Sequence, residues 1–304
     1  MKIIFCKKNI LKAFSLVEIS MVILIIGILI SGITKSFDLY EDFILINAKK
    51  ITKNSIVPRI EGLGLWLETT LDESFNSDFS KKDTAYALPW KSIAPRGDKI
   101  IIKNGQGYYV NKRINSLPAI TWNQVFESAS SDIVSAEGLA TNDGVTIFVV
   151  YKCYEQYPEK SCGTLVAIES SDAGAIYRYG ISHMWGTLVF WIGHNDALNG
   201  IGYGYSEEDI RKLPRIITAR ASDSKINISI DGLEVANGNV VNSIKPVGNK
   251  IYVRIGYSNG GSLTYRYIKG IIGEVIIYGR ALKDKEVKSV EEYLSKKWRI
   301  PINK

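Results

Sequence analysis

The sequence contains one long apolar segment, Phe14–Thr34, which reads FSLVEISMVILIIGILISGIT. Its only ionisable side chain is that of Glu18. A helix of about 20 mostly apolar residues spans a bilayer, so this segment is long enough to do so. Lysines precede the segment, whereas Asp38, Glu41 and Asp42 follow it. The positive-inside rule therefore predicts a single-pass protein with its N-terminus in the cytoplasm and the remainder exported.

The formal net charge of +7 is concentrated at the N-terminus. Four of the 38 basic residues, and no acidic residue, lie within residues 1–13. The other 34 basic residues are nearly balanced by 31 acidic ones. A nucleic-acid-binding surface needs a concentrated basic face. We therefore expect no nucleic-acid partner.

Several kinds of N-terminal segment have an apolar run of this length. A cleaved signal peptide ends at a small-x-small site, which the sequence ISGITKSF at the end of the run does not offer. A lipoprotein needs a cysteine just after the run, and Cys6 lies before it. A plain signal anchor stays open as an alternative. It gives no reason, however, for a carboxylate near the start of the run, where lipid makes a charge costly.

Residues Lys12–Glu18, KAFSLVE, are followed by an apolar stretch containing IIGIL, and together they resemble a type IV prepilin N-terminus. In that family a basic leader is cut just before a phenylalanine, the new N-terminus is methylated, and the fifth mature residue, a glutamate, helps to register neighbouring subunits. The resemblance implies cleavage between Ala13 and Phe14 by a prepilin peptidase. It also implies N-methylation of Phe14 and a filament-assembly role for Glu18. Two features depart from the family: Ala13 stands where glycine is usual, and no proline occurs between Phe14 and Lys50.

Beyond the apolar run the sequence predicts that the helix continues to about Ile56, before Pro58. Apolar residues recur there at helical spacing and so share one face. The residues of this face are Phe37, Tyr40, Ile44, Ala48 and Ile51. The predicted organisation is a leader (1–13), a transmembrane and stalk helix (14–57) and a C-terminal domain (58–304).

The C-terminal domain carries the pattern of many short strands. Apolar runs alternate with clusters of Gly, Asn, Asp and Ser, and residues 224–230 alternate polar with apolar side chains before the turn pair Asp231–Gly232. Many short strands without intervening helices are typical of an antiparallel sandwich or jelly roll. The predicted strands are Lys99–Lys103, Tyr108–Lys112, Val145–Lys152, Gly163–Glu169, Thr187–Gly193, Arg215–Ala221, Lys225–Asp231, Lys250–Tyr257 and Ile271–Tyr278.

One helix is predicted at the end of the chain. Asp284 is a suitable N-cap residue for it. Val287, Val290 and Leu294 have the spacing of a single helical face, so we expect them to form its buried stripe.

An ordered series of short motifs runs through the C-terminal domain. The motifs are Gly64–Leu67, Leu117–Ile120, Gly144–Val150, Gly270–Tyr278, Ala281–Leu282, Glu286, Glu292–Leu294 and Lys297–Trp298. Their order and spacing resemble the laminin G-like or concanavalin-like lectin/glucanase sandwiches over about residues 64–300. The resemblance implies a mainly β fold, an antiparallel jelly-roll sandwich carried on the N-terminal helix. Trp66, Trp122 and Trp298 are expected to fill its core.

The sequence carries no recognisable catalytic motif. Glucanases of this superfamily place closely spaced acidic residues on one strand for a retaining two-carboxylate mechanism, and no E-x-D-x-x-E occurs here. The acidic cluster of Glu68, Asp72 and Glu73 is expected to be a solvated loop. His183 and His194 are expected on the surface or in loops, because no G-x-S-x-G accompanies them. We therefore predict that the chain is not an enzyme.

An aromatic cluster in a stretch rich in Gly, His and Asn is the candidate ligand face. It consists of Trp185, Trp191, Tyr203 and Tyr205. Aromatic faces beside amides suit the recognition of sugars or peptides. The alternative is that these side chains fill the sandwich. Calcium often accompanies laminin G-like folds, but no D-x-D-x-D-G loop occurs, so we assign no metal and no other cofactor.

Cys153 and Cys162 are the two cysteines outside the leader. They flank a polar loop between two predicted strands, so their Cα atoms are expected within the separation of about 4.4–6.8 Å that a disulfide requires. Export places them where disulfides persist. We predict a Cys153–Cys162 disulfide, with two free thiols as the alternative.

These features predict a pilin-like or pseudopilin subunit of a type IV pilus or a type II secretion-type filament. It would be a single-pass protein of the bacterial inner membrane, with its C-terminal domain in the periplasm or outside the cell. A domain of roughly 240 residues is bulky for a repeating subunit, which favours a minor or tip position. The expected partners are other pilin subunits and a glycan or a host or surface protein. The alternative is a membrane-anchored glycan-processing hydrolase or lectin that does not polymerise.

Overall fold

The computed structural model describes residues 15–76, 79, 81–83, 85, 87, 89–95, 101–102, 107–122, 144–154, 162–172, 175–184, 186–194, 197–204, 213–222, 224–240, 251–256 and 268–303. The chain divides into two compact units, residues 1–43 and 44–304. The division falls within one continuous helix, α1 (Leu16–Lys53). A short 3₁₀ turn, Val57–Arg59, follows α1 and contains Pro58. The prediction of a long N-terminal helix that ends before Pro58 is confirmed.

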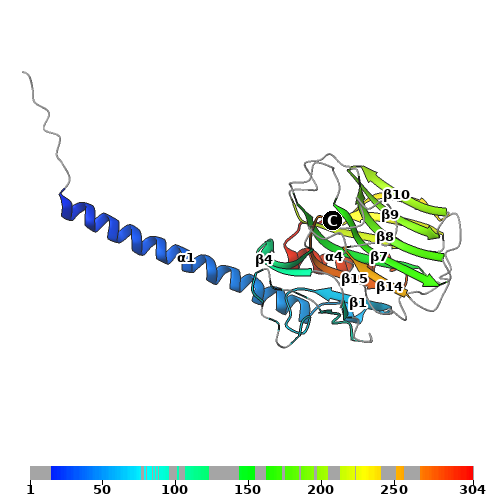
Figure 1. Ribbon diagram of the computed structural model, residues 1–304, viewed down its shortest axis with the longest axis horizontal. Helices are drawn as coiled ribbons and strands as arrows, with labels where there is room; N and C mark the ends of the chain where they lie inside the picture. The colour runs from blue at the N-terminus through cyan, green and yellow to red at the C-terminus, as the bar shows by residue number, and fades with distance from the viewer. Residues whose placement is uncertain are drawn as a thin grey trace, which may run out of the picture. The chain divides into compact units, whose positions relative to one another are not determined.

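The first unit consists, in its described part, of the beginning of α1, drawn in blue in Figure 1. Its apolar side chains are exposed throughout, from Leu16 at 87% to Phe43 at 64%. By length and composition it is the one helix, among the described residues, that is able to span a membrane. A helix that is apolar on every side and buried on none needs a non-aqueous environment or partner helices.

The second unit is a sandwich of two antiparallel sheets (Figure 1). The larger sheet has the order β13 (Leu233–Asn239), β12 (Lys225–Ile230), β11 (Arg215–Ala221), β6 (Val145–Cys153), β15 (Gly270–Tyr278), β5 (Leu117–Trp122) and β4 (Gly107–Ile114), and β1 (Leu63–Glu68) pairs with β15 as well. The smaller sheet has the order β10 (Ala197–Gly204), β9 (Thr187–His194), β8 (Ala175–Met184), β7 (Gly163–Asp172) and β14 (Ile251–Ile255). A separate pair is formed by β2 (Trp90–Lys91) and β3 (Ile101–Ile102).

Strand β15 is the centre of the larger sheet. It pairs with β6 and also with both β5 and β1. In this register Val275 lies opposite Val149 of β6 and Leu67 of β1. All nine residues of β15 are buried, and Glu274 is the one charged residue in its otherwise apolar sequence, as expected of a strand covered on both faces. The strand predicted over Ile271–Tyr278 therefore joins β1, β5 and β6 in one sheet.

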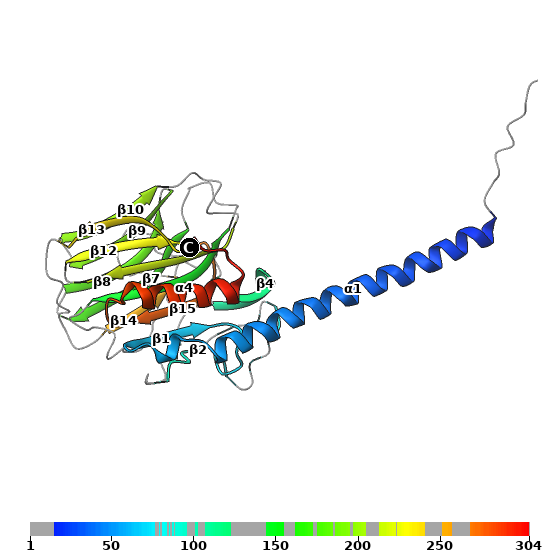
Figure 2. The same ribbon diagram turned by 180° about the vertical axis from the view of Figure 1, so that it is seen from behind.

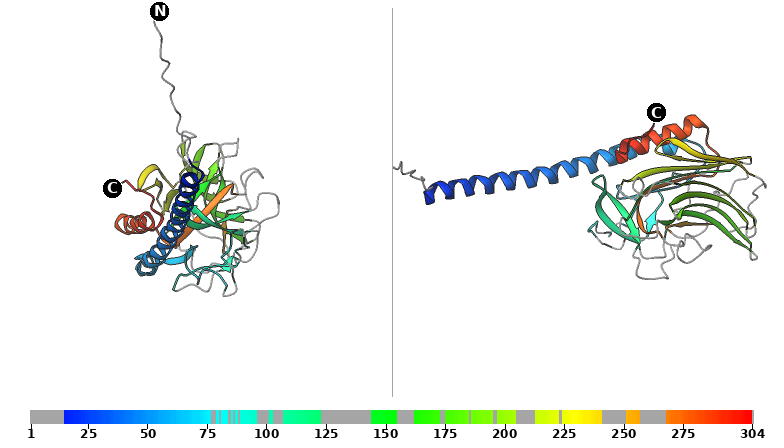
Figure 3. Two further views of the ribbon diagram at one scale, coloured as in Figure 1. Left: turned by 90° about the vertical axis from the view of Figure 1, so that its left-hand side faces the viewer. Right: turned by 90° about the horizontal axis from the view of Figure 1, so that it is seen from above.

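Two hydrophobic cores result from this arrangement. The first lies between the sheets and joins side chains such as Val275 of β15 to Phe190 of β9. The second lies on the other face of the larger sheet, beneath the helix α4 (Asp284–Trp298) and the last turns of α1, where Ile44 and Ala48 are buried. Figure 2 shows α4 lying along this sheet, and Figure 3 (right) shows α4 and the smaller sheet on opposite sides of it.

The predicted fold class, a mainly β antiparallel sandwich with a long apolar N-terminal helix, is confirmed. Trp66, Trp122 and Trp298 are buried at 3%, 5% and 0% exposure, as predicted. One detail of α4 is corrected: Lys283, and not Asp284, is the N-cap residue. The Glu286 carboxylate accepts a hydrogen bond of 2.8 Å from the Lys283 backbone N–H, so the first turn is closed by the residue at position N3.

Candidate functional site

The predicted aromatic ligand face is only partly described by the structure. Trp185 and Tyr205 lie outside the described residues. Trp191 and Tyr203 lie on opposite faces of the smaller sheet, because Trp191 pairs with Gly200 whereas Tyr203 pairs with Leu188, a core residue. These two side chains therefore do not share one surface, and the prediction is corrected in this respect.

Trp191 lies on the outer face of the smaller sheet, half-buried. Its Nε1 donates a hydrogen bond of 3.1 Å to Ser182 Oγ on the neighbouring strand. A Cβ atom added to Gly180 would lie 2.0 Å from the indole ring, so the ring lies directly over this glycine. Only glycine permits such a close approach. The indole is thus fixed across β8 and β9, in the manner of a preformed aromatic contact surface.

The same row across the outer face ends at a buried ion pair. Gly180 pairs with Ala167 of β7, and Ala167 pairs with Arg254 of β14. Arg254 Nε lies 2.7 Å from Glu169 Oε2, with side-chain exposures of 7% and 2%. A buried charge is tolerated when it is paired in this way. No local sequence pattern predicts this pair, because its members are 85 residues apart.

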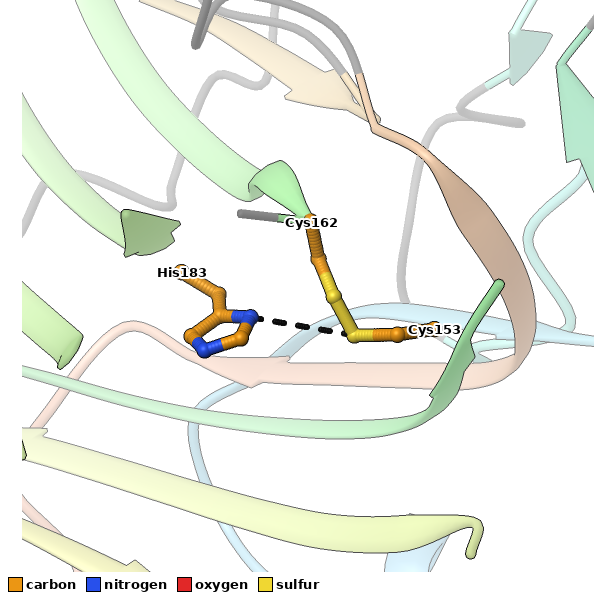
Figure 4. The surroundings of a disulfide bond; sticks show 3 residues. All are labelled: Cys153, Cys162 and His183. Carbon is orange, nitrogen blue, oxygen red and sulfur yellow. Dashed lines mark hydrogen bonds between the residues drawn. A yellow bond between two sulfur atoms is a disulfide. The ribbon is translucent and has the colours of Figure 1, made fainter. Parts of the chain in front are cut away.

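The cysteines form the predicted disulfide, with a Cα–Cα separation of 5.7 Å. His183 lies beside it on β8, and its Nδ1 is 3.7 Å from Cys153 Sγ (Figure 4). The expectation of a surface or loop position for His183 is wrong, since only 2% of the residue is exposed. The side chain of His194 lies outside the described ones. Within the described part of the chain, Cys153, Cys162 and His183 are the one group close enough to hold a metal ion. Both sulfur atoms are used by the disulfide.

The acidic cluster expected in a solvated loop is divided by the structure: Asp72 and Glu73 are exposed, as predicted, whereas the prediction for Glu68 is wrong. Glu68 is the last residue of β1 and is fully buried. Its Oε2 accepts a hydrogen bond of 2.9 Å from Lys297 Nζ, and its Oε1 accepts one of 2.6 Å from Ser74 Oγ. Lys297 Nζ also lies 2.8 Å from Glu274 Oε2. Glu68 therefore belongs to a closed ionic network beneath α4.

The electrostatics of this network follow from its partners. Burial alone would raise the pKa of Glu68, but the Lys297 ammonium and hydrogen bonds from Ser74 and Thr70 outweigh burial and lower it to about 2. Burial would likewise lower the pKa of Lys297, and the carboxylates of Glu274 and Glu68 raise it instead. Both groups are held charged. The side chains of Glu68, Glu274 and Lys297 are not exposed to solvent, so the role of the network is structural.

The N-terminus of α1 contains a reciprocal cap. The Ser15 N–H donates a hydrogen bond of 2.8 Å to Glu18 Oε2, and the Glu18 N–H donates one of 3.1 Å to Ser15 Oγ. This is a capping box. Glu18 therefore has a role in a plain signal anchor as well, contrary to expectation, because its carboxylate caps the first turn of its own helix. Ala13 and Phe14 lie outside the described residues.

No protein-family model and no curated protein matches the chain. Solved structures do match it in fold. One is the binding domain of Paraclostridial Mosquitocidal Protein 1, with a TM-score of 0.53 and 16% identity over 76% of this chain and 52% of that chain. Another is the binding domain of botulinum neurotoxin serotype D/C, with a TM-score of 0.50 and 10% identity over 77% and 52% of the two chains. This chain thus spans about half the length of these binding domains.

A third similar structure corrects the prediction that the chain is not an enzyme. Trypanosoma rangeli sialidase in complex with sialic acid matches 78% of this chain and 33% of its own, with 14% identity and a TM-score of 0.48. The missing E-x-D-x-x-E and G-x-S-x-G motifs exclude only those two arrangements of catalytic residues. What the matches share with this chain is its fold, a sandwich of two antiparallel sheets.

Proposed function

We propose that this chain is a pilin-like, membrane-anchored subunit that displays a ligand-binding sandwich. The observation that carries the proposal is the first part of α1. Its most apolar 18-residue window contains no buried residue, and a lone carboxylate, Glu18, stands at its start. A fully exposed apolar helix with one acidic residue at its tip suits lateral packing among identical helices as well as insertion in a bilayer.

The processing and position of the subunit follow the prepilin resemblance. A prepilin peptidase would cut between Ala13 and Phe14, and Phe14 would be methylated. The lysines of the leader favour retention of the N-terminus in the cytoplasm, which leaves the sandwich in the periplasm or outside the cell. The bulk of the sandwich favours a minor or tip position in a pilus or in a secretion-type filament.

The sandwich would supply the binding activity. Two structures of similar fold are binding domains by their titles, which supports a binding role for the sandwich. The proposed ligand, a glycan or a surface protein, follows from the resemblance of the ordered motifs to lectin-like sandwiches. The disulfide at Cys153–Cys162 agrees with an exported domain. The laminin G-like family remains part of this proposal, carried by the ordered motifs between residues 64 and 300.

N-terminal mass spectrometry of the protein purified from membranes tests the proposal. The expected mature N-terminus is Phe14, heavier by one methyl group. Retention of Met1, or a new N-terminus after residue 30, would overturn the pilin assignment. An unprocessed protein would have the same anchor and the same sandwich, so the binding role would remain to be measured separately.

A second candidate is an anchored lectin that does not polymerise. The capping box favours it, because Ser15 and Glu18 satisfy each other's backbone N–H groups within one chain. In this candidate Glu18 acts only on the stability of the first helical turn. The two candidates therefore differ in what Glu18 does, and substitutions at Ser15 and Glu18 separate them.

A further inference from the structure

The two cysteines and the histidine beside them connect the two sheets of the sandwich. Cys153 is the last residue of β6 in the larger sheet and lies opposite Gly270 of β15. Cys162 directly precedes β7 of the smaller sheet. Its backbone N–H donates a hydrogen bond of 3.1 Å to the carbonyl oxygen of His183 on β8. The backbone of each of the three residues is therefore held in place by hydrogen bonds to a strand.

The side chains of this group have nearly the spacing of a tetrahedral metal site. The two Sγ atoms and one ring nitrogen of His183 all lie within 4.8 Å of one another. His183 Nδ1 is turned toward Cys153 Sγ at 3.7 Å (Figure 4). Zinc binds sulfur at about 2.3 Å and nitrogen at about 2.0 Å, so tetrahedral geometry separates a sulfur from a nitrogen ligand by about 3.5 Å.

The disulfide is what prevents these atoms from binding a metal ion. Two sulfur ligands of one tetrahedral zinc ion are about 3.8 Å apart, which is farther than an S–S bond permits. The thiolate, and not the disulfide sulfur, is also the form of cysteine that binds metals. A metal site at these residues therefore requires the reduced protein.

Burial and charge favour zinc over other divalent ions. Cys153, Cys162 and His183 are each only 2% exposed, so the charge of an ion bound there has to be compensated by its ligands. Two thiolates and a neutral imidazole supply two negative charges, which neutralise a divalent cation. Sulfur and nitrogen donors suit zinc, whereas calcium and magnesium prefer oxygen ligands.

We propose that the reduced domain binds one zinc ion through Cys153, Cys162 and His183, and that the disulfide and the zinc ion are alternative cross-links between the two sheets. A dithiol reductant donates two electrons and two protons to the disulfide, which becomes two thiols, while the dithiol becomes a disulfide itself. Zinc then replaces the two thiol protons, which are released. Three protein ligands leave the fourth position to water. The site would exist whether or not the chain is a pilin-like subunit.

The test compares metal binding by the oxidised and the reduced full chain in detergent. A Cys6→Ser background removes the third cysteine. The reduced form is obtained with dithiothreitol in urea, refolded without oxygen and freed of reductant. Cobalt(II) is the probe, because thiolate–cobalt bonds absorb strongly in the near ultraviolet. The reduced chain should bind one cobalt ion with this absorption, and zinc should displace it. The oxidised chain should bind none.

His183→Phe removes the nitrogen ligand and keeps a ring at this position. The reduced variant should bind cobalt at least about tenfold more weakly than the reduced parent. His194→Phe is the matched control, because His194 is the other histidine of the chain, and its affinity should be unchanged. The thermal unfolding transition of each variant checks its folding.

Two measurements on the parent chain do not depend on the variants. X-ray absorption of the zinc-loaded reduced protein should show two sulfur neighbours and an imidazole. Zinc should also raise the melting temperature of the reduced form and leave that of the oxidised form unchanged, because a ligand stabilises the state that binds it.

Several outcomes would overturn the proposal. They are a reduced chain that binds no cobalt or lacks the thiolate absorption, and an oxidised chain that binds cobalt as tightly as the reduced one. A folded His183→Phe variant with unchanged affinity, or a zinc spectrum without imidazole, would equally show that His183 is not a ligand.

Discussion

Lys297 Nζ lies 2.9 Å from Glu68 Oε2, and neither side chain is exposed to solvent. The contact joins α4 at the end of the sandwich to β1 at its beginning, across 229 residues of sequence. A buried ion pair of this kind gives little net stability relative to an apolar pair, but removal of one partner leaves a charge without compensation. The stability of the contact between α4 and β1 therefore depends on both members of the pair.

Lys297→Met is expected to destabilise the fold by about 3–5 kcal/mol, because Glu68 and Glu274 would remain buried without their ammonium. Urea unfolding followed by tryptophan fluorescence measures the change. Lys296→Met is the matched control: Lys296 is the exposed neighbour on the same helix, and its removal should change stability by less than about 0.5 kcal/mol. Equal effects of the two substitutions would show that the buried ion pair is not what makes Lys297 important for stability.

The stability of the sandwich is expected to fall as the pH drops from about 4.5 to about 2. The pKa of Glu68 is about 2 in the folded protein, against 4.5 for an ordinary glutamate. A carboxylate with a lowered pKa stabilises the fold above its unfolded pKa and loses this contribution as the pH falls toward its folded pKa. The loss is on the order of 3 kcal/mol. Melting temperatures of wild type and Glu68→Gln across this pH range measure it, and the variant should have the flatter profile.

Reduction of the Cys153–Cys162 disulfide is expected to lower the stability by about 2–3 kcal/mol, since the bridge closes a short loop in the unfolded chain. Urea midpoints with and without a thiol reductant give the difference. A double Cys153→Ala, Cys162→Ala variant should not respond to the reductant. Labelling of two thiols in unfolded, non-reduced protein from the cell envelope would show that the bridge does not form in the cell.

Glu18→Val and Ser15→Ala should have different consequences if Glu18 registers neighbouring subunits. Both substitutions break the capping box, at a cost of about 1 kcal/mol to the first helical turn. Only Glu18→Val removes the carboxylate, so only this variant should fail to enter filaments, while both insert in the membrane. Incorporation is scored by the amount of each variant in sheared filaments. Normal incorporation of Glu18→Val would favour the anchored lectin.

Cleavage is expected to be faster after Ala13→Gly, because glycine is the usual residue before the cut in prepilins. Pulse-chase labelling of the two forms gives the processing rate. A bulky residue such as Ala13→Leu is the opposite control and should slow cleavage. Equal rates for all three would argue against a prepilin peptidase.

The parts of the fold that the sequence predicts are those with local causes. The helix α1 follows from apolar and helical spacing, and β12 follows from strict alternation before the Asp231–Gly232 turn. The apolar pattern predicts no strand over β8 or β10, because it is broken by Gly180 in β8 and by Gly200, Gly202 and Gly204 in β10. Glycine there reflects close approach and an open face, which depend on neighbouring strands.

The errors at the candidate site have the same origin. Glu68 resembled a solvated residue because its partner, Lys297, is remote in sequence. Trp191 and Tyr203 resembled one surface because only the register of β10 against β9 reveals that they lie on opposite faces. A shift of one residue in that register would exchange the faces. Long-range partners and strand register are therefore what sequence patterns leave undetermined.

The central strand β15 is also the last strand along the chain. A ribosome completes it only at Tyr278, when β1, β5 and β6 have long been synthesised without the strand that joins them. The hydrogen bonds of α1, by contrast, are all local and form as soon as the helix is made. A chain cut short before Gly270 would thus keep its apolar helix but leave unpaired strand edges open to aggregation and proteolysis. Because β15 is made last, only a chain that includes this strand can form the complete larger sheet.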